Sequence, residues 1–123
     1  LYLKTKGLWK DVLVHESVTM SDDARTAKLS GDLLHHSIPN AAYHHRLLGE
    51  RYAPLAARQM FDNKRKTSDF KIMTVGATTF LSQYLLKGGF RDGLPGFCAA
   101  KFSAHHAFLK HLLLRELQEN NDE

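Results

Sequence analysis

Cysteine is nearly absent from this chain of 123 residues, in which Cys98 is the single example. One thiol excludes a disulfide within the chain, and the apolar neighbours of Cys98 favour a packed side chain over a reactive one. Two spacings that mark zinc sites, Cys-x-x-Cys and His-Glu-x-x-His, are missing, although the chain has eight histidines. We therefore expect no dedicated metal site within this chain.

Long hydrophobic runs are missing as well. No apolar segment of the sequence approaches the ~18 to 20 residues of a membrane-spanning helix, and no positively charged leader precedes a hydrophobic segment. Any membrane contact is therefore expected to be peripheral. The chain begins with Leu1 rather than Met and enters strand-like sequence at once, so we interpret it as the later part of a longer protein.

Acidic residues are the minority among the charged ones, 13 against 17 Lys and Arg, and the pI is near 9.3. The resulting net charge of +4 suits anionic partners such as phosphorylated substrates, acidic lipid head groups or nucleic acid. The basic residues are interrupted by acids and follow no zinc-finger or RNA-binding signature, so no nucleic acid partner is expected. With 43% hydrophobic residues, the chain has the composition of one folded domain.

The first third of the chain has the pattern of β-structure. Residues 1–4, 11–20 and 27–36 carry β-branched residues or alternate apolar with polar side chains. Residues 21–26, between the last two of these segments, have the composition of a turn. The sequence therefore predicts a strand followed by a β-hairpin.

Helical spacing replaces this pattern after residue 39. Apolar residues recur at three- and four-residue steps over residues 43–60, with Asn40 as a candidate helix cap. Pro54 is expected either to start a new helix or to kink this one. The segment predicts the first of three helices, and the fold class is α+β.

Two more helices follow a polar, basic connector. The second begins after a cap at Ser68 or Asp69, and the third runs from about Phe97 to Leu117. Between them, the glycine-rich segment 87–97 must leave one helix, turn sharply and begin another. The apolar stripe of the second helix consists of Phe70, Met73, Ala77, Phe80, Leu81 and Tyr84.

Basic residues flank this stripe, and two interpretations of it remain open. Cations at the ends of an amphipathic helix suit anionic lipid head groups. An apolar stripe at helical spacing is also the usual sign of a helix packed in a core, with solvated ends. The candidate membrane-surface residues are Lys64, Arg65, Lys66, Lys71, Lys87 and Arg91.

The adjacent pair His15 and Glu16 closes a predicted strand. A carboxylate at a strand end that opens onto a cleft is suited to act as a general base. Adjacent strand residues point to opposite faces, however, so the two side chains cannot easily act on the same substrate atom, and plain solvent exposure is the alternative.

Asp92, in the glycine-rich segment, also has two possible roles. An Asp before Gly commonly caps the following helix or bonds neighbouring backbone amides. Its alternative job is to bind a sugar hydroxyl, and spacing does not decide between them.

Two stretches, LWKDVLVHESV and LSGDLLHHS, resemble the segment after the nucleotide-binding half of family 2 glycosyltransferases. The likeness is strongest to the bacterial β-1,4-glucosyltransferase-like enzymes of lipopolysaccharide core synthesis. Those relatives show a tryptophan, then Val-His-Glu, then a strand ending in a histidine. Trp9, His15, Glu16 and His36 occupy these places here.

The segment FLSQYLLKGGFRDGLPGFCAAKFSAHHAFLKHLLLREL resembles the C-terminal helices of the same family. There a Phe-Leu-x-x-Tyr run leads to Gly-Phe-x-Asp-Gly and then to an alanine-rich helix. Relatives often carry a proline before the Phe-Leu run, where this chain reads KIMTVGATTF. The matching residues are Phe80, Leu81, Tyr84, Gly89, Phe90, Asp92, Gly93, Gly96 and Phe97.

The resemblance implies an inverting GT-A transferase, in which a base activates an acceptor hydroxyl for direct displacement at the anomeric carbon of a sugar nucleotide. It implies that Glu16 is this base, that His15 fixes the strand or lines a neighbouring surface, and that Trp9 packs beneath the acceptor. The further candidate substrate-binding residues are His36, Asp92 and Gly93.

The resemblance also implies a divalent metal, Mg or Mn, bound in the complete enzyme through an Asp-x-Asp motif that this chain lacks. Residues 1–39 would complete the catalytic GT-A domain, and residues 40–123 would form a helical acceptor and membrane side. We expect a cytoplasmic enzyme, peripheral on the inner face of the membrane, and no activity from this chain alone. The alternative is a stand-alone α+β module that binds anionic membrane or a protein partner.

Overall fold

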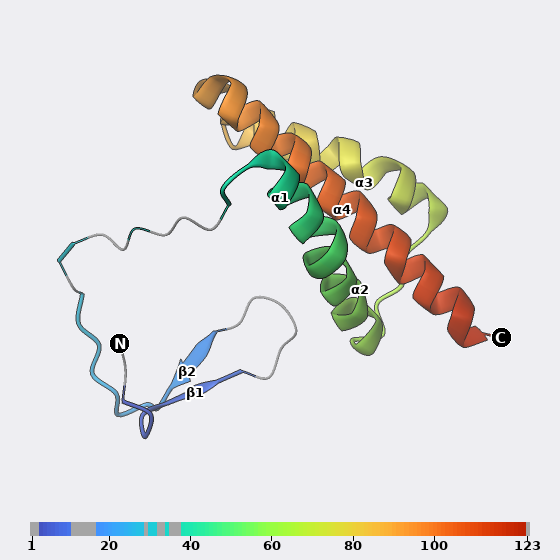
Figure 1. The fold of residues 1–123 in the computed structure, drawn as a ribbon. Helices are drawn as coiled ribbons and strands as arrows, with labels where there is room; N and C mark the ends of the chain where they lie inside the picture. The colour runs from blue at the N-terminus through green and yellow to red at the C-terminus, as the bar shows by residue number, and fades with distance from the viewer. Residues whose placement is uncertain (1–2, 11–16, 29, 32–33, 35–37, 123) are drawn as a thin grey trace.

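The computed structural model describes residues 3–10, 17–28, 30–31, 34 and 38–122. Within them the chain is an α+β protein, in which a short antiparallel hairpin precedes three helical stretches (Figure 1). The predicted order, strands first and helices afterwards, is confirmed.

The hairpin consists of β1 (Gly7–Trp9) and β2 (Val18–Met20). The strands run antiparallel, with Leu8 opposite Thr19. A side-chain ion pair between Lys6 and Asp23 lies beside them, and the Lys6 ammonium lowers the pKa of the Asp23 carboxyl.

The hairpin predicted from the sequence is wrong in its pairing. Residues 18–20 are a strand, as expected, but they pair with residues 7–9 and not with residues 27–36, whose described members form no strand. Leu3 and Lys4, predicted to be in a strand, precede β1 and lie in or beside a turn. Period-two alternation shows which side chains share one face of a strand, but it does not show which strand pairs with which. Several segments of this chain have the same pattern, so the pairing could not be read from it.

The first helical stretch comprises α1 (Ala41–Leu47), a π-helical segment η1 (Leu48–Tyr52) and α2 (Ala53–Asp62). Asn40 caps it as predicted, because its side-chain oxygen accepts a 2.8 Å hydrogen bond from the amide of Tyr43.

Pro54 is the second residue of α2, which follows the π-helical segment directly. In a regular helix the proline ring would meet the carbonyl four residues earlier. Here the amide of Ala53 donates to the carbonyl of Leu48, five residues back, so the turn before the proline is wider than an α-turn. The proline is thus accommodated within one continuous helical stretch.

The second stretch comprises α3 (Asp69–Leu81) and a π-helical segment η2 (Ser82–Leu86). Ser68 is its cap, with the side-chain oxygen accepting from the amide of Lys71 at 3.3 Å. Asp69 instead occupies the first turn, where a negative charge interacts favourably with the helix dipole.

The last helix, α4 (Gly93–Asp122), is longer than predicted at both ends. It begins before Phe97 because Pro95 lies in its first turn, where a missing amide hydrogen leaves no helical bond unmade. Its polar tail stays helical, and Arg115 there donates to Glu119 one turn later at 2.7 Å.

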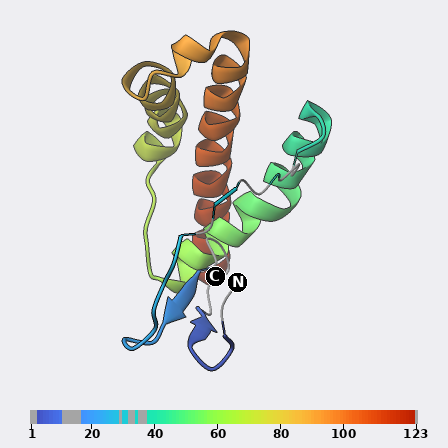
Figure 2. The same cartoon turned by 90° about the vertical axis from the view of Figure 1, so that its left-hand side faces the viewer.

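The core follows the length of α4, which lies between the α1–α2 stretch and α3 (Figure 2). Alanines hold several of its buried positions, which lets the helices approach closely. Each outer helix therefore buries one side against α4 and leaves the other side uncovered by it. The buried apolar residues are Leu48, Ala53, Ala57, Val75, Ala100, Ala107 and Leu114.

Leu114 is the largest fully buried side chain among the described residues, with 0% exposure. We expect Leu114→Ala to lower the free energy of unfolding by about 2 to 5 kcal/mol, because it removes apolar contacts and leaves a cavity. Leu86→Ala is the matched control, since Leu86 is 85% exposed. Urea unfolding followed by circular dichroism measures both, and equal losses would contradict the packing described for α4.

Candidate functional site

The glycine-rich segment forms the turn that joins α3 and η2 to α4. Gly88 has a φ of +75° and directly follows Lys87, at which the helical stretch ends. A single 3-10 turn, η3 (Gly89–Asp92), comes next, and Gly93 enters α4 with a φ of +60°. Both positive angles favour glycine, since other residues rarely adopt them.

Two glycines of this turn are also required by space. A Cβ on Gly96 would lie 1.9 Å from the carbonyl oxygen of Gly89, and one on Gly89 would lie 2.9 Å from the carbonyl oxygen of Gln83. Both obstacles are backbone atoms, which cannot rotate away. The start of α4 therefore lies directly against η3.

Four aromatic rings pack at this turn and form what we call the aromatic cluster: Phe80, Tyr84, Phe90 and Phe97. The Phe80 ring stacks on Tyr84 with centroids 5.3 Å apart, and Phe97 meets these two rings edge-on at 5.6 and 5.7 Å. Phe90 meets Tyr84 edge-on at 6.4 Å. Such edge-on and offset arrangements are the favourable ones for aromatic side chains.

The cluster and the glycines account for most of the motif that resembles glycosyltransferase helices. The motif residues of the Phe-Leu-x-x-Tyr run and of the glycine-rich segment follow one another within residues 80–97, and they pack together at this one turn. Of the two predicted substrate residues here, Gly93 provides the positive φ with which the chain enters α4, and Asp92 is exposed at the end of η3. The sugar-binding role of Asp92 remains a prediction.

The other predicted substrate residues belong to the N-terminal third. Trp9 closes β1 opposite Val18 and is 63% exposed. His15, Glu16 and His36 lie outside the described residues, so their predicted roles are not tested by this structure.

The six predicted membrane-surface residues divide into two groups at opposite ends of α3 and η2. The connector residues Lys64, Arg65 and Lys66, with Lys71, lie at the start, and Lys87 and Arg91 lie at the glycine-rich turn. All six are exposed. Lys64 has a φ of +55°, a conformation that costs an ordinary residue roughly 1 to 2 kcal/mol.

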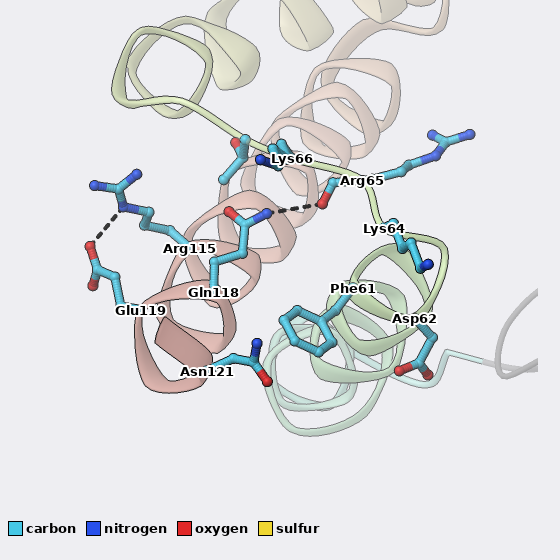
Figure 3. A pocket seen from close by; sticks show the side chains of 10 residues that line it. Phe61, Asp62, Lys64, Arg65, Lys66, Arg115, Gln118, Glu119 and Asn121 are labelled. Atoms are coloured by element: carbon cyan, nitrogen blue, oxygen red, sulfur yellow. Dashed lines mark hydrogen bonds and ion pairs between the residues drawn. The ribbon is translucent and has the colours of Figure 1, made fainter. Parts of the chain in front are cut away.

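The connector also borders an open cleft of about 600 Å³ beside the C-terminal part of α4 (Figure 3). Gln118 donates a 3.0 Å hydrogen bond to the carbonyl of Arg65, which ties the connector to α4. Arg115 pairs with Glu119, and the side chains of Arg65 and Arg115 extend in opposite directions (Figure 3). The cations of this cleft thus do not converge on one point, and we assign it no ligand.

Histidines lie at the contact between α1 and α4. The His44 ring lies 4.1 Å from Phe102, and His45 stacks on His105 with centroids 5.5 Å apart. In the part of the chain that the structure describes, no group of three or more His, Cys, Asp or Glu residues could hold a metal ion. These rings pack one helix against the other.

Cys98 corrects one expectation, because its thiol is exposed on α4 and is not packed. The helix buries Gly96 and Ala100 instead. Apolar neighbours in sequence therefore misled the prediction, since adjacent residues of a helix point in different directions.

The apolar stripe of the second predicted helix is divided between two environments. Phe80 and Tyr84 belong to the aromatic cluster, whereas Phe70, Met73 and Leu81 are exposed. Further large apolar side chains that were not singled out from the sequence, at Leu85, Leu86 and Leu94, are also exposed, as is Phe90 of the glycine-rich motif. Helical spacing in the sequence groups such residues on one side of a helix. It does not show whether another helix covers that side.

A scan of protein-family models and searches of curated proteins and of solved structures found no match to this chain. Among the described helices, none combines the length and the apolar character needed to cross a membrane.

Substituting Gly96 tests the tight turn. We expect Gly96→Ala to lower the free energy of unfolding by about 3 kcal/mol, the upper end of typical overpacking effects, because the new Cβ would overlap the Gly89 carbonyl. Gly49→Ala is the control, since a Cβ there has nothing within 4 Å, and alanine is the better helix former. Denaturant titration compares the two, and a harmless Gly96→Ala would refute the close approach.

His111 makes stability depend on pH. It is buried on α4, its Nδ1 lies 3.0 Å from the Thr67 hydroxyl, and burial, followed by the nearby charges of Lys110 and Lys71, lowers its pKa. The unfolded chain therefore binds this proton more readily than the folded one. The stability contributed by neutral His111 is present above the ordinary histidine pKa and is lost as pH falls through the lowered one.

We expect His111→Gln to reduce the loss of stability between about pH 7.5 and pH 5.5, a range that spans the ordinary histidine pKa. The measurement is the urea midpoint at each pH. An unchanged slope in His111→Gln would exclude His111 as the source.

Proposed function

We propose that this chain is the C-terminal portion of an inverting glycosyltransferase of family 2 type. The complete enzyme would move a sugar from a sugar nucleotide to a saccharide or glycolipid acceptor in cell-envelope polysaccharide synthesis, of which lipopolysaccharide core synthesis is the closest example. It would act at the cytoplasmic side of the membrane.

The proposal rests on two sequence motifs that occur in the order in which the family has them, and the second motif forms one packed turn. The Phe-Leu-x-x-Tyr run supplies Phe80 and Tyr84 to the aromatic cluster, and the glycine-rich segment supplies Phe90 and Phe97. The co-linear Val-His-Glu motif near the N-terminus supports the same family independently.

In the proposed reaction, the carboxylate of Glu16 accepts the proton of an acceptor hydroxyl. The hydroxyl oxygen forms a bond to the anomeric carbon, the bond from that carbon to the phosphate oxygen breaks, and the nucleoside diphosphate leaves with the electron pair. Attack from the side opposite the leaving group inverts the anomeric centre. Trp9 and His36 would line the acceptor, and His15 would fix the strand.

The proposal assigns no metal to this chain. The resemblance implies Mg or Mn held by an Asp-x-Asp motif in a preceding region, and the described residues contain no cluster suited to a metal. The 123-residue chain by itself is proposed to be inactive.

Glu16→Gln in the longer protein that contains the nucleotide-binding half tests the base. We expect transfer to fall by about 100-fold or more, because general bases commonly contribute that much, while sugar-nucleotide binding stays nearly unchanged. Release of nucleoside diphosphate from a panel of sugar nucleotides, with cell-envelope glycolipid as acceptor, measures transfer. Glu50→Gln, at an exposed position of η1, is the control.

Unchanged turnover in Glu16→Gln would reject the base assignment. Transfer catalysed by the purified 123-residue chain alone would overturn the proposal that a preceding half supplies the donor site.

A further inference from the structure

The side of α3 that faces away from α4 carries a row of exposed apolar side chains. Phe70, Met73, Ala77 and Leu81 follow one another at three- and four-residue steps, so they lie on one side of a helix with 3.6 residues per turn. Val75, which is buried against the core, falls on the other side. Leu85, four residues after Leu81, continues the row into η2.

Further large apolar side chains are exposed after this row, at the end of η2 and in the glycine-rich turn. Met73 is 80% exposed and Leu86 is 85% exposed, values close to those of a free side chain. Large apolar side chains gathered on one surface mark an interaction site more often than scattered ones do. We use the name outer face for the row on α3 together with the exposed apolar residues that follow it up to the start of α4; its large apolar members are Phe70, Met73, Leu81, Leu85, Leu86, Phe90 and Leu94.

Cations stand at both ends of the outer face. Lys66 and Lys71 lie at the start of α3, and Lys87 and Arg91 lie at the turn, with about 22 Å of helix from Phe70 to Leu85 between the two ends. All four are exposed.

Acidic residues offset this charge only in part. Asp69, at the start of α3, lies 3.9 Å from Arg115 and is thereby partly neutralised. Asp92 lies beside Arg91 in the turn. Two cations against one carboxylate leave each end of the face with a net positive charge.

We propose that the outer face rests on an anionic membrane surface. The apolar side chains would enter the boundary between head groups and acyl chains, while Lys66, Lys71, Lys87 and Arg91 would contact acidic head groups. The proposal is independent of sugar transfer, because it concerns binding without donor or acceptor. It applies equally to a part of a transferase and to a stand-alone module.

The charge distribution favours a membrane over a second copy of the chain. Both ends of the outer face carry cations, so a copy laid along it in either direction would bring like charges together, which opposes association. A surface of acidic lipids complements the two ends at once, and it accepts apolar side chains without requiring a matching groove.

Co-sedimentation with vesicles tests the proposal. Vesicles of phosphatidylcholine alone are compared with vesicles that contain equal amounts of phosphatidylcholine and phosphatidylglycerol. We expect the 123-residue chain to bind the anionic vesicles and to be largely released at about 1 M salt, where the screening length falls to about 3 Å. No binding to the anionic vesicles at low salt would overturn the proposal.

Two pairs of variants locate the contact. Met73→Gln with Leu86→Gln should weaken binding about tenfold or more, because burying one such side chain is equivalent to about a factor of ten. Leu8→Gln, at a 76% exposed position of β1, should bind as the wild type does. Circular dichroism checks that each variant keeps its helices, which is expected because the replaced side chains are exposed.

The charge variants follow the same design. Lys87→Gln with Arg91→Gln should weaken binding and reduce its dependence on salt. Lys4→Gln with Arg25→Gln removes the same charge from exposed positions in the N-terminal third and should have a smaller effect. Equal losses in both pairs would show attraction by net charge alone and would overturn the assignment to the outer face.

A second copy remains a distinguishable outcome. Sedimentation velocity over a range of concentrations reports dimers directly. Dimers that Met73→Gln with Leu86→Gln abolishes, together with absent vesicle binding, would assign the outer face to self-association and reject the membrane.

Discussion

The approach of the Gly89 carbonyl to Gly96 is the constraint on which the helical arrangement depends. A side chain at Gly96 would separate η3 from the start of α4, because its Cβ would lie 1.9 Å from that oxygen. With the gap closed, the chain reverses over a single 3-10 turn, and α4 returns beside α3 (Figure 2). The aromatic cluster then fills the space at the reversal, which gives the turn an apolar support of its own.

This reversal also decides which surfaces of the helices are buried. Because α4 lies between its two neighbours, it contributes Ala100, Ala107 and Leu114 to the core, whereas α3 contributes Val75. A helix that is buried on one side normally carries polar residues on the other. In α3 the other side carries Phe70 and Met73, so the helix is only weakly amphipathic. These two side chains are exposed because α4 packs against the opposite side of α3.

The helices could be predicted because their signals are local. Asn40 and Ser68 cap the helices that they were predicted to cap, since a cap needs only the side chain and the next few amides. The partner of β2 could not be predicted, because pairing depends on distant residues that share the same alternation. The division of the stripe between Tyr84 in the aromatic cluster and Met73 in solvent likewise depends on where α4 lies.

The same distinction governs how much each motif supports the proposed transferase. Gly89, Gly96 and the aromatic cluster are accounted for by the geometry of the turn, so their likeness to glycosyltransferase helices supports a common shape and carries no chemistry. Asp92 is different, because it is exposed at the end of that rigid turn. A carboxylate held on a fixed backbone is suited to position a sugar hydroxyl. The chemistry of the proposed transferase is assigned instead to Glu16, which is proposed as the base from its motif alone. In the complete enzyme the turn would form part of the acceptor side. The outer face, which reaches the same turn, would hold this part of the enzyme against a lipid surface.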